Sequence, residues 1–425
     1  MTYYSPVGSL GADGADPEED PMGASNAEEL LPYPIPNDAA LSPPAEWEEL
    51  RDRCPVAHVR FPSGDEATLL TRYDDVRQVL SDPRFGRGTE AEDAAQMSDS
   101  GGVFNSMLAM ALPQTGEAHR RWRRLLNRWF TARRMAALRP RIAEMAERLV
   151  DEMVEQGRPA DLKAALGFPL PVWVICDMLG VPDADRDRFA HWSNLLLNLT
   201  RYTREEVAAG EAEFFAYMGG HIAAKRAHPG DDVLSELIAA GEAEAEPWSD
   251  TTLIATGLGL LIAGHETTAN MIGKMIAMLL SDRRRWEQLL TDPSRVRVAV
   301  EETLRLDTNA GFGMVRYVDE DTDVAGTRIA KGTTVVCSMA AANRDERAFE
   351  HADELDLTRS PNPHLAFGAG PHSCLGQALA RTELQVTLEV LLRKLPTLEL
   401  AVPPEELQRV EGLAVGGLRE VPVRW

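Results

Sequence analysis

Cysteine is scarce in this sequence and the few that occur are scattered. The 425 residues contain four, at Cys54, Cys176, Cys337 and Cys374, and no C-x-x-C pair is among them. This spacing argues against a disulfide framework and against a tetrahedral zinc site. We therefore expect a protein of the reducing cytoplasm.

Basic residues are also in short supply, because 44 Lys and Arg stand against 67 Asp and Glu and give a formal net charge of -23. This balance argues against a nucleic-acid partner, since phosphate binding needs a basic face. Arginine is nevertheless concentrated between Arg120 and Arg134, where seven of fifteen residues are Arg and none is acidic. We expect a docking patch there for an acidic partner or an anionic ligand; the alternative is a solvated helix face.

Long apolar runs are lacking too. The longest, Leu253 to Ala263, is short, contains glycine and is closed by Glu266, so no membrane span is expected. The chain opens without the basic segment and apolar run of a signal peptide. These features predict a protein without a membrane partner.

Residues 1–40 are rich in Gly, Ala, Pro, Asp and Glu without an apolar period, which predicts a disordered acidic tail. The remaining residues, 41–425, are expected to form one domain, mainly α with a minor β part, wrapped round a cofactor. A small helix is predicted near 74–81, and helical periodicity predicts helices over 117–130, 135–156, 169–179, 184–199, 204–227, 232–240, 249–280, 284–306 (in two pieces) and 375–395. Short strands are predicted around 59–61, 67–71, 323–325, 328–329 and 333–337.

One glycine-rich stretch, Phe367 to Gly376, reads F-G-A-G-P-H-S-C-L-G and places Cys374 immediately before a predicted helix. The free N–H groups and the positive dipole end of a helix N-terminus lower a thiol's pKa and favour a thiolate that can bind a metal. Gly368 and Gly370 allow a tight turn and a close approach to a flat ligand.

This stretch resembles the haem-binding loop of the cytochrome P450 family, and the resemblance covers about residues 45 to 425. It implies the single-domain P450 fold of the soluble bacterial type round a buried haem b. Cys374 is implied as the axial thiolate of the iron, with Phe367 and Gly376 as further cofactor contacts. The alternative is a buried structural cysteine at a helix start.

A second stretch, Ala263 to Thr268, reads A-G-H-E-T-T and puts charge inside an apolar helix. The Thr267 hydroxyl can bond the Ala263 carbonyl and open a local bulge. The stretch resembles the family's oxygen-activation motif, which implies catalytic roles for Glu266 and Thr267 in relaying protons to bound dioxygen. The alternative for Glu266 is a structural pair with an arginine, and His265 is expected to face outward.

Glu302 and Arg305 lie three apart on one predicted helix face. They match the family's E-x-x-R motif, and Arg359 matches its third member; the implied role is structural, beneath the haem. Leu306 to Met314 departs from the family, because it has two glycines and no proline, and we expect a looser backbone over the pocket there.

Haem carries two propionates, which need cationic or hydrogen-bonding partners when buried. Positions that match the family's propionate contacts are His119, Arg123, Arg316, His364 and His372.

Substrate contacts are implied by the resemblance alone. The segments are apolar and contain Met and Phe, which suits a hydrophobic small molecule, although core packing would look the same. The residues are Phe104, Met107, Leu260, Ala263, Gly264, Phe312, Met314 and Ala414.

The sequence thus predicts a haem-thiolate monooxygenase that uses dioxygen to hydroxylate or epoxidise a hydrophobic small molecule in secondary metabolism. No G-x-G-x-x-G lies between a strand and a helix, so a separate ferredoxin and ferredoxin reductase are implied as electron donors. Two alternatives stay open: coupling, desaturation or peroxide-driven hydroxylation at the same haem, and a non-enzymatic haem-based sensor or carrier.

Overall fold

A computed structural model describes most of the chain. The described residues are 30–37, 39–87, 91, 93–97, 111–197, 201–308, 312–410 and 415–425. Residues 31–425 form one compact unit. This unit starts earlier than the predicted residue 41, because β1 (Leu31–Pro32) pairs with the sheet and Tyr33 is buried. The tail predicted for residues 1–29 lies outside the described part.

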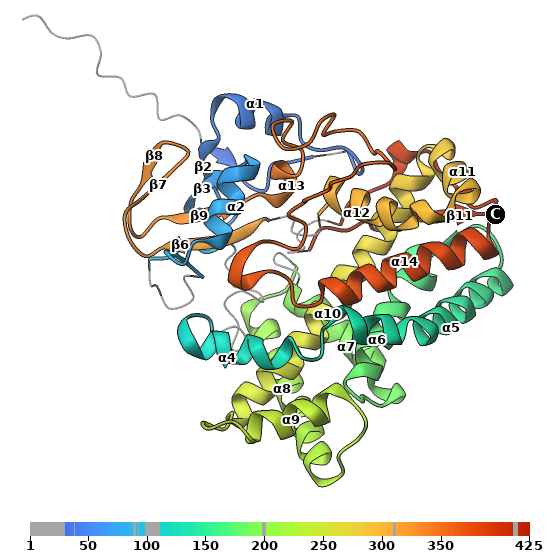
Figure 1. Ribbon diagram of the computed structural model, residues 1–425, viewed down its shortest axis with the longest axis horizontal. Coiled ribbons are helices and arrows are strands. Elements are labelled where there is room, and N and C mark those ends of the chain that lie inside the picture. The colour runs from blue at the N-terminus through green and yellow to red at the C-terminus, as the bar shows by residue number, and fades with distance from the viewer. Residues whose placement is uncertain are drawn as a thin grey trace, which may run out of the picture. The chain divides into compact units, whose positions relative to one another are not determined.

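Helices make up most of the unit (Figure 1). They are α1 (Glu46–Arg53), α2 (Tyr73–Ser81), α4 (Gly116–Leu126), α5 (Ala132–Gln156), α6 (Pro169–Met178), α7 (Arg186–Leu197), α8 (Arg204–Ala227), α9 (Val233–Glu242), α10 (Asp250–Leu280), α11 (Arg283–Thr291), α12 (Val296–Leu306), α13 (Met339–Ala342) and α14 (Gln377–Lys394). The predicted helices, α2 included, are confirmed, with ends shifted by a few residues; α1 and α13 were not predicted.

The largest sheet has six strands in the order β1-β2-β3-β9-β6-β4. Its further strands are β2 (Val56–Arg60), β3 (Glu66–Leu70), β9 (Thr334–Cys337), β6 (Met314–Val318) and β4 (Phe85–Gly86). Two small sheets contain β5 (Ala160–Asp161), β10 (Glu399–Leu400) and β11 (Pro422–Arg424), and β7 (Thr322–Val324) with β8 (Thr327–Ile329). In β6, Met314 and Arg316 are two apart and so point to the same face of the sheet.

Helix α10 crosses the interior and packs against α6, α8, α12 and α14. Ser249 caps its N-terminus by accepting the Thr252 amide. A Cβ at Gly264 would lie 2.8 Å from Ile175 Cγ1, so glycine allows α6 to approach α10 closely. The bulge expected beside Thr267 is absent, because the helix is α throughout these described residues.

The predicted ion-pair network is confirmed. Arg305 Nη2 lies 2.8 Å from Glu302 Oε1, and both side chains are fully buried. Arg359 Nε donates to the same carboxylate at 3.0 Å. Arg305 also donates to the carbonyl oxygens of Asn343 and Ala352, so the network ties α12 to the chain before the Cys374 loop.

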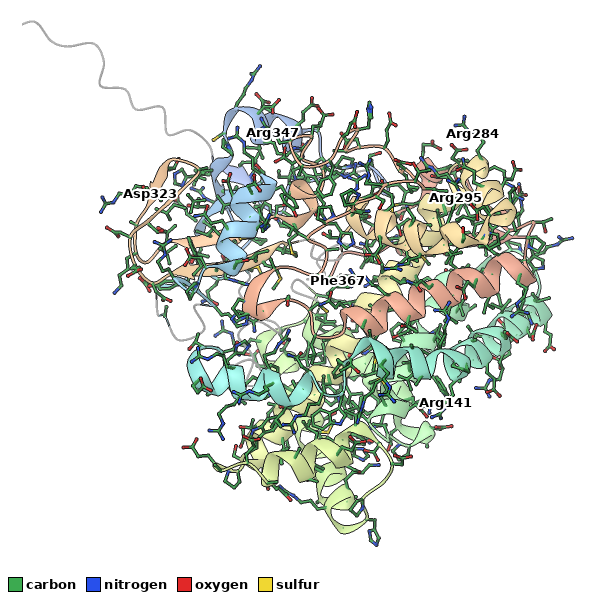
Figure 2. All side chains as sticks on the ribbon, viewed as in Figure 1. Arg141, Arg284, Arg295, Asp323, Arg347 and Phe367 are labelled. Carbon is green, nitrogen blue, oxygen red and sulfur yellow. The ribbon has the colours of Figure 1, made fainter. Side chains whose placement is uncertain are left out.

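Charged side chains such as Arg141, Arg284 and Arg347 extend outward at the edge of the unit, whereas Phe367 lies inside it (Figure 2). None of the helices in the described part combines the length and the apolar character needed to cross a bilayer.

Candidate active site

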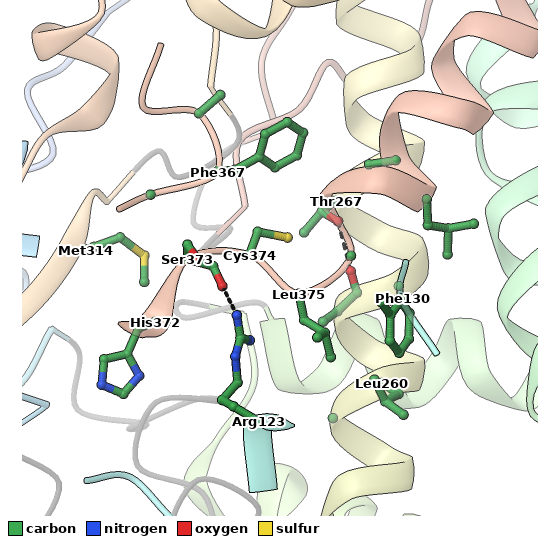
Figure 3. Close-up of a pocket in the computed structure, with 18 of the residues that line it drawn as sticks. Arg123, Phe130, Leu260, Thr267, Met314, Phe367, His372, Ser373, Cys374 and Leu375 are labelled. Atoms are coloured by element: carbon green, nitrogen blue, oxygen red, sulfur yellow. Dashed lines mark hydrogen bonds between the residues drawn. The ribbon is translucent and has the colours of Figure 1, made fainter. Parts of the chain in front are cut away.

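A cavity of about 470 Å³ lies between α10, α4, β6 and the loop that precedes α14 (Figure 3). Most of its wall is apolar and comes from segments far apart in the sequence. That wall includes Leu112, Phe130, Ile175, Leu260, Met314, Phe367 and Val415.

The loop that carries Cys374 depends on two glycines with positive φ. Gly370 has φ +69°, and a Cβ there would lie 2.6 Å from the Leu80 carbonyl oxygen. Gly368 has φ +68°. The Cys374 amide donates to the Phe367 carbonyl at 2.8 Å and closes the turn. The tight turn predicted for this glycine-rich stretch is therefore confirmed.

Cys374 lines the cavity and is exposed to it, although many protein atoms lie close to its sulfur. Burial raises its pKa, and this effect outweighs the backbone N–H groups of Gly376 and Gln377 and the guanidinium of Arg123, which favour the thiolate. The expected net lowering of the pKa is therefore wrong for the protein alone. A bound metal cation supplies the positive charge that deprotonates such a thiol.

Two predicted arginines line the cavity. Arg123, on α4, donates from Nη2 to the carbonyl oxygen of Ser373, the residue before the cysteine (Figure 3). Arg316, on β6, is 2 % exposed and donates to the Val315 carbonyl at 2.8 Å. Both partners are neutral oxygens, so neither guanidinium has a carboxylate as its hydrogen-bond partner in the described part of the chain.

Two predicted histidines also line the cavity, and their rings stack with centroids 4.4 Å apart. Burial and the nearby guanidinium of Arg87 lower the pKa of His372 to about 3. Burial and the guanidinium of Arg123 lower the pKa of His119 as well. Both rings are therefore neutral near pH 7, and their N–H groups can donate hydrogen bonds.

Sequence reasoning missed Arg87 and Gln114, which both line the cavity. Arg87 Nη1 donates to Gln114 Oε1 at 2.9 Å. Burial, with Arg316 and Arg123 nearby, lowers the pKa of Arg87 to about 10. An isolated arginine between two glycines carries no local signal of this role.

The residues present fit a haem group. Among the described residues that line the cavity there is no Asp or Glu, although three guanidiniums face it. Buried cations without counter-charge are costly, and the two carboxylates of a haem supply that charge. Cys374 supplies the single soft ligand that an iron porphyrin takes from one side.

His364 was expected to contact the cofactor, but it does not line the cavity. Its Nε2–H donates to Glu301 Oε2 at 3.0 Å, and its side chain is 2 % exposed. The side chain of Glu301 also binds Arg381, with Nε 2.7 Å from Oε1. We therefore assign His364 to this ion-pair cluster and not to the cofactor set.

In the A-G-H-E-T-T stretch, Thr267 lines the cavity and donates to the Ala263 carbonyl at 2.9 Å. Glu266 is not among the lining residues, and its Oε1 accepts from Asn270 Nδ2 at 2.9 Å. The expectation that His265 faces outward is wrong: it is 1 % exposed and its Nδ1 lies 2.7 Å from the Leu261 carbonyl oxygen.

Of the expected substrate contacts, Leu260, Ala263, Gly264 and Met314 line the cavity. Phe312 does not, because it is buried in an apolar cluster with Val336. Phe104, Met107 and Ala414 lie outside the described residues.

A cysteine thiol, a cationic cradle and an apolar cavity beside a long helix define a thiolate-ligated haem protein. The sequence profile described as Cytochrome P450 matches residues 221–413. The chain is 42% identical to the mycinamicin IV hydroxylase/epoxidase of Micromonospora griseorubida over 92% of its own length and 98% of that protein. It is also 42% identical to the nocardicin C N-oxygenase of Nocardia uniformis subsp. tsuyamanensis, over the same shares.

Solved structures agree. The putative thioether synthase SgvP, involved in the tailoring step of griseoviridin, superposes with a TM-score of 0.88 at 38% identity over 93% of this chain and 100% of that one. The chain belongs to the cytochrome P450 family. It is a P450 monooxygenase that oxidises a small molecule, and its family uses haem with a cysteine thiolate and dioxygen.

Proposed function

We propose that Cys374 is the axial ligand of the haem iron, and that His119, Arg123, Arg316 and His372 hold the propionates. The observation that carries this assignment is a single thiol facing a cavity that contains guanidiniums without carboxylates in its described lining. When bound, a thiolate-ligated haem activates dioxygen for insertion into a C–H or C=C bond.

The protein's own residues hold and orient the reactants. Arg123 fixes the carbonyl of Ser373 and hence the backbone that presents Cys374. The amides of Gly376 and Gln377 stabilise negative charge on the sulfur. Thr267 places a hydroxyl at the cavity surface, where it can hold a water or pass a proton.

Glu266 precedes Thr267 in α10 but is not among the described residues that line the cavity. Asn270 donates a hydrogen bond to its carboxylate. Burial lowers the pKa of Lys163, and the nearby negative charge of Glu266 opposes this shift. This arrangement favours a role for Glu266 in proton supply rather than in direct contact with substrate.

The proposed substrate is a hydrophobic secondary metabolite, which the enzyme hydroxylates or epoxidises. The apolar cavity wall and the names of the two curated relatives support this class. The proposed electron donors are a ferredoxin and its reductase in the cytoplasm, docking on the exposed arginines of α4 and the turn after it. These are Arg120, Arg124 and Arg128.

The carbon monoxide difference spectrum of the reduced protein tests the ligand assignment. We expect the far-red-shifted Soret band of thiolate ligation in the wild type and its loss in Cys374→His. A wild-type protein that binds haem without this band would refute the proposal. Substrate turnover with a generic ferredoxin system would exclude the sensor alternative.

A further inference from the structure

The cavity contains one more guanidinium than a haem needs. Arg87, Arg123 and Arg316 all line it. Two propionates neutralise two of them, and the charge of a thiolate is offset by the iron it binds. This count includes the guanidiniums and leaves out both histidines. It leaves one positive charge in the cavity without a negative charge to balance it among the described lining residues.

Arg87 is the residue in excess. Arg123 and Arg316 occupy two of the five positions that the family resemblance assigns to propionates, whereas Arg87 matches none of them. Among the described residues, Arg87 donates a hydrogen bond to a neutral amide oxygen, that of Gln114 at 2.9 Å. The adjoining wall residues, Leu112 and Pro113, are apolar.

A guanidinium that lines a largely apolar cavity, and whose hydrogen-bond partner among the described residues is a neutral amide, is a suitable binding site for an anion. Its planar fork matches the two oxygens of a carboxylate, and such charge-assisted pairs are strong when water is excluded. Burial and the neighbouring guanidiniums of Arg316 and Arg123 depress the pKa of Arg87. The charged form of Arg87 is therefore destabilised, and a bound anion would stabilise it.

We propose that the substrate of this enzyme is a hydrophobic small molecule that carries a carboxylate, and that Arg87, positioned by Gln114, binds this carboxylate inside the cavity. The inference rests on the proposed function, because the count assigns two of the three guanidiniums to haem propionates. Arg87 thereby selects acids over their neutral analogues, and the apolar wall accepts the rest of the molecule.

Azole probes test this without knowledge of the natural substrate. A series of ω-(imidazol-1-yl)alkanoic acids of increasing chain length and the matching primary amides bind the haem iron of the holoenzyme through imidazole. Absorbance titration then gives a dissociation constant for each member of a pair. We expect the acid to bind about tenfold or more tightly than the amide at the chain length that reaches Arg87.

The preference should disappear in Arg87→Gln and fall to an intermediate value in Arg87→Lys, which keeps the charge and loses the fork. The matched control is Arg328→Gln, which removes an equal charge from an exposed side chain on β8 and should keep the preference. Haem content, measured on the same samples, should be unchanged in all three variants.

Three outcomes would overturn the inference. The first is a wild type with no acid preference at any chain length, and the second is a preference that survives in Arg87→Gln. The third is loss of haem in Arg87→Gln, which would make Arg87 a third propionate partner. The carbon monoxide spectrum is read separately, so a failure of thiolate ligation is distinguishable from each of these outcomes.

Discussion

Lys274 and Asp307 form an ion pair inside the protein, with Nζ 3.1 Å from Oδ1 and the lysine side chain fully buried. Lys274 also donates to the carbonyl oxygens of Asp307 and Thr308. Arg409 binds the other carboxylate oxygen at 3.3 Å. The pair thus joins α10 to the end of α12, where the chain leaves toward Met314 on the cavity wall.

The first prediction concerns this pair. Lys274→Met leaves the buried Asp307 carboxylate with Arg409 as its ion-pair partner among the described residues, and we expect it to lower the free energy of unfolding by about 3 kcal/mol. The double variant Lys274→Met with Asp307→Leu removes both charges and should be more stable than the single one. Urea unfolding of the four proteins in the cycle gives the coupling energy. Additive effects would show that the two charges do not depend on each other.

The second prediction is a pH dependence. Burial alone would raise the pKa of Glu301, but hydrogen bonds from His364 and Arg381 lower it from 4.5 to about 2. A lowered acid pKa stabilises the fold above pH 4.5, and this contribution is lost as the pH falls toward 2. We expect Glu301→Gln to cost about 2 kcal/mol at pH 7, allowing for solvent screening, and the difference from wild type to shrink between these pH values.

Unfolding free energies measured at a series of pH values check this. Glu399→Gln is the control, because Glu399 pairs with Arg424 on the surface and both side chains are about half exposed. A difference in unfolding free energy between wild type and Glu301→Gln that stays constant as the pH falls would contradict the lowered pKa of Glu301.

The third prediction concerns the buried carboxylate of Glu302. It accepts hydrogen bonds from Arg305, Arg359 and the amide of Asp356. Glu302→Gln leaves the fully buried Arg305 without counter-charge and should cost about 3–5 kcal/mol. Glu287→Gln, which breaks an exposed pair on α11, should cost less than about 1 kcal/mol. Denaturant unfolding measures both variants. Equal losses of unfolding free energy in Glu302→Gln and Glu287→Gln would argue against a stabilising role of the buried Glu302 network.

The fourth prediction concerns Thr267. Thr267→Ala removes the hydroxyl from the cavity surface, so the yield of oxidised product per electron pair should fall about tenfold or more while hydrogen peroxide increases. Thr267→Ser keeps a hydroxyl and should retain most of the coupling. Product and peroxide are measured together against electrons consumed. Unchanged coupling in the alanine variant would remove Thr267 from the proton path.

The fifth prediction concerns docking. Arg124 and Arg128 are exposed, and reversing both charges to Glu should slow reduction by a ferredoxin about tenfold or more at low ionic strength, with a smaller effect in high salt. Arg284→Glu on α11 is the control, because the Arg284 side chain is 84% exposed and helix α11 lies far from α4 in Figure 1. Unchanged stopped-flow reduction rates would show that the ferredoxin docks on another surface.

Sequence reasoning worked where residues that act together lie close in the chain. The Cys374 loop and the Glu302–Arg305 pair are local patterns, so their geometry follows from the turn and the helix. The direction of the Cys374 pKa was wrong because local sequence shows the helix N-terminus and not the protein that buries the sulfur.

Partners that lie far apart in the chain were harder to predict from the sequence. His364 was assigned to the cofactor from the family resemblance. No sequence pattern indicates that its N–H donates to Glu301, on α12, instead. Arg87 and Gln114 were missed because they meet only after folding. Phe312 looked like a cavity residue among glycines, whereas the sheet buries it against Val336.

The phenolic oxygen of Tyr73 donates to the Pro363 carbonyl at 2.6 Å across a separation of 290 residues. Nearby, Gly370 rests on the backbone of Leu80. During translation, Tyr73 and Leu80 therefore leave the ribosome long before Pro363 and Gly370. The cavity can close only when translation is almost finished. Nascent chains that stall before Pro363 carry the six-stranded sheet and α10 without the Cys374 loop, so the complete cavity forms only late in synthesis.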